Sequence, residues 1–450
     1  MYLLCLTKGK KLVNITKSEF ILVLIIMVSS ISLLQIEYFT KGDAQEEETE
    51  VHFSDNSGRP GINDPNFRVG EVVSGLDLPT TMAFLGPDDM LVLEKDKGTV
   101  RRVTNGKLLD QPLLDFTVAT QSERAMGGIA ISHRDSKTYV FLYLTELEQS
   151  NTDGDDLKKG VKPLGNRLYK YEFIDGKLVN PLLLLDLPAL PGPRHNGGAI
   201  IVGPDNNIYI PVGDVDGTYQ GVKYQTQTQN YEDGIEADGR SGILRVNQDG
   251  QPVGEGILGD EIPLRLYYAY GIRNSFGITF DPVTGNLWET ENGPGNSDEI
   301  NLVLPGFNSG WRETMGLAKN DDDFDLSNMV DFGGKGVYRD PELVWLNTAG
   351  PTGIKFLSSD KYGAQYKNDL FVGDVHNGRL YHFKLNDDRT HLILEGPLAG
   401  KVIKTPNSDG LDQIVFGEGF GGITDLEIGP DGYLYIVSIG QGKIFKIVPS

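Results

Sequence analysis

Two short polar stretches combine residue types that could transfer a proton and bind an anion. The stretch 194–198 reads RHNGG and stands directly before an apolar, strand-like segment. His195 could act as a general base near neutral pH, and the two glycines would let a ligand approach the backbone closely. Arg273 and Asn274 precede another such segment, and a guanidinium can bind an anion or a carbonyl through two parallel hydrogen bonds. Taken alone, each stretch also fits a loop that bonds only to the backbone.

A third stretch, 291–311, has the composition of an oxygen-rich metal site. It carries Glu291, Asp298 and Glu299 in a loop rich in Gly and Pro. Carboxylates and the carbonyls of irregular backbone are the hard oxygen ligands that Ca²⁺ takes. The stretch therefore predicts a calcium site, with a solvated acidic loop as the alternative.

The elements that must position these residues repeat along the chain. Six segments share a short apolar strand, a turn with Gly, Asp or Pro, and a second apolar strand, which is the pattern of a β-hairpin. They begin at Met82, Ile129, Ala199, Ile278, Ile354 and Leu426. Two hairpins in each unit of roughly 70 residues make one four-stranded sheet, as in the blades of a propeller.

We therefore predict an all-β fold, a six-bladed β-propeller over residues 67–450, preceded by an N-terminal hydrophobic helix. Helical patterns are scarce, and the 56 glycines among 450 residues suit many tight turns. The strand-like segment 67–76 is expected to pair with the C-terminal end and close the ring. Two β-sandwiches in series are the alternative, although they do not predict six similar hairpins.

The N-terminal part has a different character. Four lysines between Lys8 and Lys17 precede the uncharged, strongly apolar stretch 20–36, a pattern typical of a secretory signal peptide or a short membrane anchor. We predict a signal peptide or anchor over 1–41 and an acidic flexible linker over 42–66. The positive flank stays inside, so the rest of the protein is expected at the extracellular face of the membrane or secreted.

Composition excludes several classes of partner and site. The chain has 63 acidic and 41 basic residues, a formal charge of −22, which disfavours nucleic-acid binding. The single cysteine, Cys5, allows no disulfide framework and no cysteine-based metal site.

The signatures found along the chain also occur together in one known family. They are HNGG at 195–198, RN at 273–274, ENGP and DEIN within 291–301, and NSGW at 308–311. In this order they resemble the soluble quinoprotein glucose/sorbosone dehydrogenase family, which includes PQQ-dependent aldose sugar dehydrogenases. The resemblance covers about residues 67–449.

This resemblance implies a six-bladed propeller that holds pyrroloquinoline quinone (PQQ) and Ca²⁺ in its central channel. His195 would be the catalytic base that takes the proton from the anomeric hydroxyl of an aldose while hydride passes to PQQ. Arg273 and Asn274 would contact PQQ, with Arg273 stabilising charge on the reduced quinone. Glu299 and the backbone of Ser309 match calcium-binding positions. An external acceptor would then remove the electrons.

Three positions depart from the family pattern. Gly422 and Thr424 stand where the last blade usually carries two arginines that bind the acidic cofactor, and Glu123 replaces a cofactor-contacting Gln. Arg194 is a nearby cation that offsets part of this loss. A propeller that has lost PQQ and serves as a binding module is therefore the alternative function. A metal-dependent lactonase is a third, disfavoured because no set of carboxylates recurs at the strand entrances.

Overall fold

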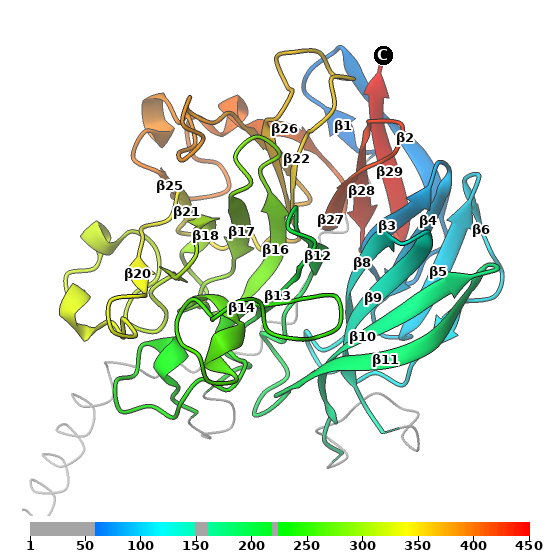
Figure 1. The fold of residues 1–450 in the computed structure, drawn as a ribbon. Coiled ribbons are helices and arrows are strands. Elements are labelled where there is room, and N and C mark those ends of the chain that lie inside the picture. Colours follow the sequence, from blue (N-terminus) through cyan, green and yellow to red (C-terminus); the bar gives the residue numbers. More distant parts are fainter. Residues whose placement is uncertain (1–58, 149–160, 218–223) are drawn as a thin grey trace, which may run out of the picture. The chain divides into compact units, whose positions relative to one another are not determined.

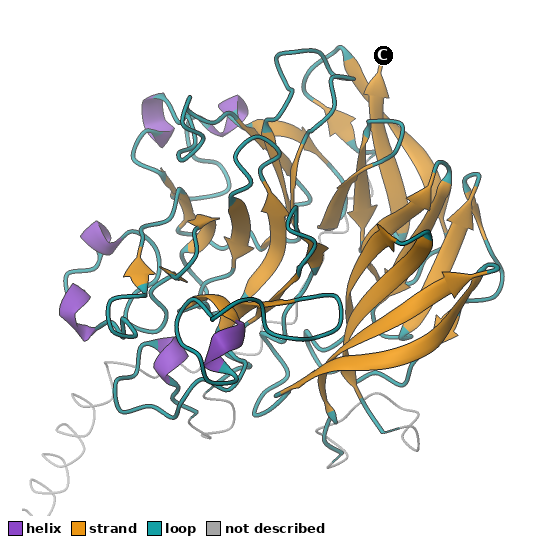
Figure 2. Cartoon of the chain, viewed as in Figure 1, coloured by secondary structure: helices purple, strands orange, loops and turns teal. Residues whose placement is uncertain are grey.

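The computed structural model describes residues 59–148, 161–217 and 224–450. This part is an all-β propeller with a few short 3₁₀ helices, as the sequence predicts (Figures 1 and 2). The predicted hydrophobic helix lies outside the described residues. No helix within those residues is long and apolar enough to cross a membrane.

The described strands form six hydrogen-bonded sheets, each beginning with one strand near the centre of the molecule (Figure 1). These first strands are β3 (Pro79–Gly86), β8 (Met126–Arg134), β12 (Ile201–Val202), β16 (Ser275–Phe280), β22 (Pro351–Phe356) and β27 (Ile423–Ile428). The second strands pair antiparallel with them and complete the predicted hairpins; they are β4 (Asp89–Glu94), β9 (Lys137–Glu146), β13 (Ile208–Val212), β17 (Leu287–Glu291), β23 (Leu370–Asp374) and β28 (Leu434–Ser438).

Further strands complete each sheet toward its outer edge. The third strands are β5 (Thr99–Thr104), β10 (Gly165–Ile174), β14 (Gly242–Val246), β18 (Asp298–Val303), β24 (Leu380–Phe383) and β29 (Lys443–Pro449). The outer strands are β6 (Lys107–Leu108), β7 (Leu114–Asp115), β11 (Lys177–Leu187), β15 (Tyr267–Tyr270), β19 (Phe307–Asn308), β20 (Val337–Tyr338), β21 (Leu343–Trp345), β25 (Val402–Ile403), β26 (Val415–Glu418), β1 (Gly61–Ile62) and β2 (Phe67–Ser74).

The 3₁₀ helices all lie in connections between strands. They are η2 (Gln227–Gln229), η3 (Leu264–Leu266), η4 (Ala318–Asn320), η5 (Leu326–Asn328), η6 (Gly396–Leu398) and η7 (Leu411–Gln413).

Neighbouring sheets meet through their central strands. β3 contacts β8, β8 contacts β12, β13 contacts β16, β16 contacts β22, β22 contacts β27, and β27 returns to β3. The approach leaves no room for side chains at Gly198 and Gly277, where an added Cβ would collide with the carbonyl oxygens of Phe276 and Thr352. Glycine at these positions is thus required by the close contact of backbones.

The ring closes between the two ends of the described chain, as predicted. β2 pairs antiparallel with β29, with Phe67 opposite Pro449 and Ser74 opposite Lys443. The chain also adds β1, which pairs with β26. Gly61 and Ile62 fall within the stretch 42–66 that we predict to be a linker, so the last residues of that stretch belong to a sheet.

Two polar side chains of β27 join the last sheet to the first. Thr424 donates its hydroxyl to the carbonyl of Pro79 at 3.1 Å, and Oδ2 of Asp425 accepts the N–H of Met82 at 2.9 Å. Burial raises the pKa of Asp425 to about 8, and the charge of Glu427 adds to the rise. The carboxyl is therefore held largely protonated at neutral pH.

Asp425 should make the stability of the ring depend on pH. Its folded pKa lies above that of an unfolded aspartate, so its contribution is complete below about pH 4 and is lost as the pH rises toward about 8. In Asp425→Asn, the free energy of unfolding should fall less over this interval, by up to about 5 kcal/mol, because each unit of pKa shift corresponds to about 1.4 kcal/mol. Urea unfolding at several pH values measures the two slopes. The exposed Asp409→Asn is the control, and equal slopes in wild type and Asp425→Asn would contradict the assignment.

Candidate active site

The residues predicted to do chemistry lie in the loops that lead into three neighbouring central strands. Glu123 precedes β8, His195 precedes β12, and Arg273 and Asn274 precede β16. The three loops contact one another, since Glu123 reaches both His195 and Asn274. The structure thus brings together side chains that are up to 151 residues apart in the sequence.

His195 is buried and held by a carboxylate. Its Nδ1 lies 2.6 Å from Oδ1 of Asp214, which follows β13. An ionised carboxylate only accepts hydrogen bonds, so Nδ1 carries the proton of the neutral ring and Nε2 carries the free lone pair. His195 itself adopts a left-handed backbone with φ of +60°, and its N–H donates to Oε2 of Glu123 at 2.7 Å. The orientation of His195 is therefore fixed both at its ring and at its backbone.

Asp214 was not among the residues predicted from sequence. Its Oδ1 also accepts the N–H of Asp216, and its Oδ2 accepts the indole N–H of Trp311, both at 2.9 Å. Burial alone would raise the pKa of Asp214, but the charges and hydrogen bonds of His195, Arg273 and Trp311 outweigh burial and lower the pKa to about 2. Asp214 is thus ionised beside His195. The signal in the sequence was the acidic residue that ends the apolar run IPVGD.

Arg273 is fixed between the His195 loop and the stretch 291–311. Its guanidinium Nη1 donates to the carbonyls of Asn292 and Gly293, at 2.9 Å each. Its backbone N–H donates to Oε1 of Glu291 at 2.6 Å, and its carbonyl accepts the N–H of Asp214 at 2.9 Å. The guanidinium carbon also lies 5.4 Å from the ring centre of Trp311. Arg273 therefore places a positive charge close to the His195–Asp214 pair.

The other predicted cofactor contacts surround this pair. Asn274 donates Nδ2 to Oε2 of Glu123 at 3.2 Å, whereas its buried Oδ1 has no hydrogen-bond partner within the described residues. Arg194 forms an ion pair with Asp216, with Nη2 and Oδ1 3.1 Å apart. Asn274 thus offers an unsatisfied acceptor that a ligand could fill, and the charge of Arg194 is shared with Asp216.

A second polar cluster lies next to Arg273, between β17, β18 and the loop after β19. Glu289, Glu291 and Glu299 are at most 1% exposed. Ser309 donates its hydroxyl to Glu291 at 2.6 Å and lies 3.5 Å from Glu299. Asn301 donates to Glu299 at 3.0 Å. Glu299 and Ser309, which the family resemblance assigns to Ca²⁺, are therefore neighbours in space, and Glu291 links them to Arg273.

The carboxyl groups of this cluster have pKa values above the usual value for glutamate. Burial raises the pKa of Glu289 and Glu299 well above the usual value, and the charge of Glu291 adds to the rise. Burial raises the pKa of Glu291 to about 7, against the lowering effect of the bonds from Ser309 and Arg273. Both oxygens of Glu289 and Oδ1 of Asn301 have no partner within the described part of the chain. Within that part, no group of three or more His, Cys, Asp or Glu side chains is placed so that those side chains alone could hold a metal ion.

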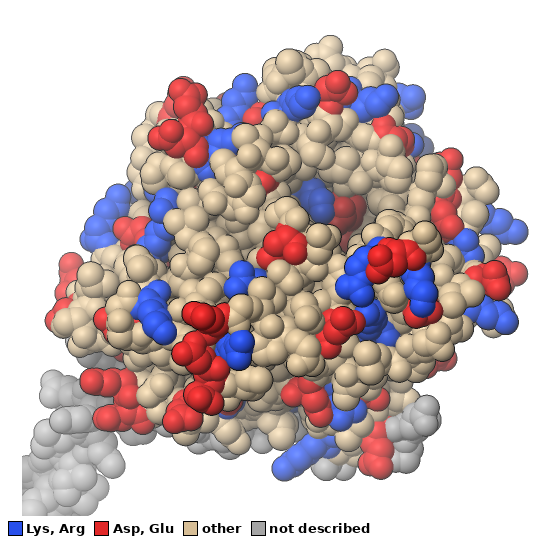
Figure 3. Space-filling view, viewed as in Figure 1, with Lys and Arg blue, Asp and Glu red and all other residues tan. Residues whose placement is uncertain are grey.

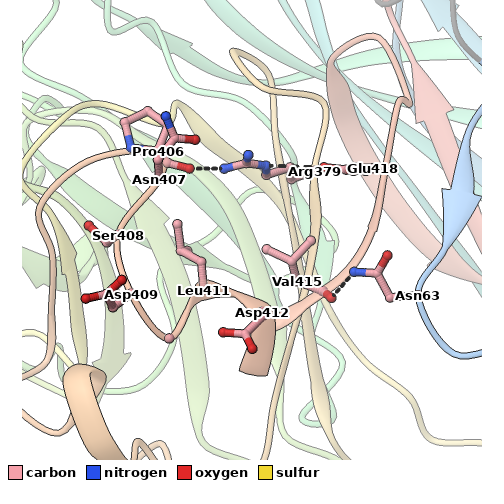
Figure 4. A pocket seen from close by; sticks show the side chains of 11 residues that line it. Asn63, Arg379, Pro406, Asn407, Ser408, Asp409, Leu411, Asp412, Val415 and Glu418 are labelled. Carbon is pink, nitrogen blue, oxygen red and sulfur yellow. Dashed lines mark hydrogen bonds and ion pairs between the residues drawn. The ribbon is translucent and has the colours of Figure 1, made fainter.

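The surface of the described part of the chain has two further features. The face of the molecule is hollowed near its centre, where basic and acidic side chains show side by side (Figure 3). A separate open pocket of about 450 Å³ lies at β24, β26 and the turn at η7, with Arg379 bonded to the carbonyl of Pro406 (Figure 4). None of the residues that line this pocket belongs to the His195 site or to the glutamate cluster.

Comparison with known proteins places this geometry in a family. The family model for glucose/sorbosone dehydrogenases matches residues 76–446. The chain belongs to the glucose/sorbosone dehydrogenase family. It is 25% identical to the aldose sugar dehydrogenase of Escherichia coli, over 83% of this chain and 91% of that protein. It is 28% identical to quinoprotein glucose dehydrogenase B of Acinetobacter calcoaceticus, over 58% of this chain and 56% of that protein.

A solved structure shares the fold. The PQQ-bound aldose sugar dehydrogenase of Streptomyces coelicolor superposes with a TM-score of 0.60 at 21% identity, over 86% of this chain and 99% of that chain. As a member of the glucose/sorbosone dehydrogenase family, the chain is related to oxidoreductases that act on sugars.

The two positions that depart from the family pattern in the last sheet have local structural reasons. Gly422 has φ of +86°, and a Cβ there would lie 3.0 Å from the carbonyl oxygen of Val375, so the backbone at this position is built for glycine. Thr424 is buried, and its hydroxyl donates a hydrogen bond to the carbonyl of Pro79 in the first sheet. These two residues therefore contribute no positive charge at the entrance of β27.

The glutamate cluster should destabilise the metal-free protein as the pH rises. The folded pKa of Glu289 is raised, so its contribution to stability is lost as the pH rises from about 4.5 through that pKa. In the presence of a chelator, Glu289→Gln should gain about 1–3 kcal/mol in free energy of unfolding at about pH 8 relative to wild type. Near pH 5 the gain should be small.

Chemical denaturation at the two pH values, with Glu418→Gln as the exposed control, measures this difference. A gain of the same size at both pH values would show that Glu289 acts through packing and not through its charge.

Proposed function

We propose that the protein oxidises an aldose sugar at the anomeric carbon, with PQQ as hydride acceptor and His195 as general base. Family membership supports sugar oxidoreduction in general. The observation that carries the specific proposal is the buried pair of His195 and ionised Asp214, 2.6 Å apart, beside Arg273 and Asn274. Base, orienting carboxylate and cation are the groups needed to remove a hydroxyl proton while charge develops nearby.

The chain's own residues would divide the proton chemistry as follows. Nε2 of His195 accepts the proton of the anomeric hydroxyl, because Nδ1–H is committed to Asp214. The ionised Asp214 stabilises the imidazolium that forms. Arg273 stabilises negative charge near the reacting atoms. Bound PQQ would supply the two-electron acceptor for the hydride.

The residues present fit an acidic quinone on the side of β8, β12 and β16. Asn274 has a buried Oδ1 without a partner in the described chain, and Arg273 and Arg194 bring positive charge to the same loops. We assign cofactor contacts to Arg273 and Asn274, with Glu123 and Arg194 at the border of the site. The side formed by β27 adds no cation, because Gly422 and Thr424 stand there.

The glutamate cluster supports Ca²⁺ as a second cofactor. Glu299 and the carbonyl of Ser309 would be ligands, and the unpartnered oxygens of Glu289 and Asn301 are oxygen donors of the kind Ca²⁺ takes. A divalent cation would also neutralise carboxylates whose burial opposes ionisation.

Two further parts of the proposal concern the whole chain. We take each of the six sheets as one blade of a six-bladed ring, supported by the cycle of contacts among central strands. The apolar stretch 20–36 and its basic flank support export, with the propeller at the extracellular face of the membrane or secreted. The electron acceptor would then be external.

A specific observation favours a second candidate, a propeller that binds a ligand without redox chemistry. PQQ carries three carboxylates, and each lost charge-assisted hydrogen bond costs about 1.5–3 kcal/mol. Gly422 is held in a left-handed backbone and Thr424 is committed to Pro79, so nothing at β27 replaces the lost cations. A sugar-binding module would keep the same hollow without the quinone.

Titration with PQQ distinguishes the two candidates. The purified protein with CaCl₂ should shift the quinone absorbance and reduce a dye when aldoses are added. His195→Ala should lower turnover by at least about 10²-fold and still take up PQQ. Parallel melting curves confirm that the variant is folded at the assay temperature. Sugar binding without PQQ uptake would overturn the proposed dehydrogenase activity and support the binding module.

Calcium should stabilise the protein through Glu299. A saturating excess of CaCl₂ should raise the melting temperature of the wild type by about 3–8 °C. Without metal, Glu299→Gln should melt at or above the wild-type temperature, because burial opposes the ionised form of Glu299, and it should respond little to CaCl₂. Glu418→Gln is the matched control and should respond like wild type. A full calcium response in Glu299→Gln would place the ion elsewhere.

A further inference from the structure

Trp311 is the one aromatic side chain that contacts both charged partners of the candidate base within the described residues. Its indole Nε1–H donates to Oδ2 of Asp214 at 2.9 Å, and its ring lies 5.4 Å from the guanidinium carbon of Arg273. The side chain is 9% exposed. Trp311 therefore lies at the junction between the orienting carboxylate and the cation.

The two oxygens of Asp214 accept hydrogen bonds from different groups. Oδ1 accepts from Nδ1 of His195 and from the N–H of Asp216. Oδ2 accepts from Trp311, and no other donor to it is found in the described chain. With Oδ2 held, the carboxylate plane is fixed and Oδ1 faces the imidazole. Without the indole donor, a buried carboxylate oxygen would lack a partner, which favours rotation of the carboxylate away from His195.

The backbone around Trp311 is itself fixed. Its N–H donates to the carbonyl of Gly271 at 2.9 Å, and its carbonyl accepts Nδ2 of Asn230 at 2.8 Å. Asn230 and Asn308 exchange two amide hydrogen bonds, at 3.0 and 2.8 Å. The backbone that carries the indole is thus held by residues other than Asp214.

We infer that Trp311 is a positioning residue. Its indole N–H sets the orientation of the Asp214–His195 pair, and its ring fixes the position of that pair relative to Arg273. This role rests on the proposed function for its catalytic consequence, but the hydrogen bond can be tested in the protein without PQQ. Under the proposed function the ligand-contacting groups are His195, Arg273 and Asn274; Trp311 acts through Asp214.

The chain offers a matched control. It has three tryptophans, and the buried indole N–H groups of Trp288 and Trp345 have no hydrogen-bond partner in the described residues. Trp345→Phe removes the same atoms as Trp311→Phe but breaks no hydrogen bond. Trp311→Phe removes the donor to Asp214 and keeps an aromatic ring near Arg273.

The first measurement is the proton resonance of His195 Nδ1–H, which lies far downfield when the donor faces a buried carboxylate. In cofactor-free protein, this resonance should be retained in Trp345→Phe and should move upfield or broaden in Trp311→Phe. An unchanged resonance in Trp311→Phe would overturn the inference, whatever the activity of the protein.

The second measurement is steady-state kinetics with PQQ and an aldose. Trp311→Phe should lower kcat about tenfold or more, the effect of one hydrogen bond to a charged group, with KM within about twofold of wild type. Trp345→Phe should match wild type. A kcat in Trp311→Phe equal to that of Trp345→Phe would overturn the role. A wild type without activity removes the proposed function, and the proton resonance then decides on Trp311.

If Trp311→Phe does not fold, Asp214→Asn supplies the converse test. The indole N–H resonance of Trp311 should shift in Asp214→Asn, while those of Trp288 and Trp345 stay in place. A Trp311 resonance that does not respond to the loss of the Asp214 charge would overturn the inference.

Discussion

The close approach of the central strands governs the rest of this structure. Where the segment before β12 meets β16, and where β16 meets β22, backbone carbonyls occupy the space that side chains would need, so Gly198 and Gly277 stand there. Chain segments that converge this tightly also bring the loops before them together. His195, Glu123 and Asn274 meet because their loops enter neighbouring central strands. The position of the candidate active site is thus a consequence of packing at the centre of the propeller.

Buried charge is the second organising effect. Around His195, each acidic side chain has donors: Asp214 accepts from three groups, and Glu123 and Asp216 are bonded to neighbouring loops. In the cluster of Glu289, Glu291 and Glu299, both oxygens of Glu289 lack a donor within the described residues, and burial raises the pKa values of all three carboxyl groups. The two regions share Arg273, whose N–H bonds Glu291 and whose carbonyl bonds Asp214. A change in the charge of the glutamate cluster therefore affects Arg273, the same residue whose carbonyl is bonded to Asp214 beside the candidate base.

Much of this arrangement could be predicted from sequence, because period-two hairpins repeat and closure needs an early strand. The pairing of 67–76 with the C-terminal end followed from that pattern, as did the meeting of His195, Arg273 and Asn274 at strand entrances. The roles of Asp214, Trp311 and Asn301 could not be found in the same way, although Trp311 and Asn301 lie in the NSGW and DEIN motifs. Their chemistry depends on register across strands and on contacts between sheets, such as that of Asp214 with a tryptophan 97 residues later. The short strand β1 was missed because two residues carry no periodicity.

The pairing of β2 with β29 has a consequence for synthesis. Phe67 finds its partner only at Pro449, and Ser450 donates its N–H to the carbonyl of Asn66 at 2.8 Å. The sheet that contains β27 and β28 therefore cannot be completed until synthesis has passed β29. Until then, β2 and β28 each expose an unpaired edge of the kind that recruits other strands. A truncation just before Lys443 would remove β29, the strand that covers both edges, although it would leave every residue of the candidate active site intact.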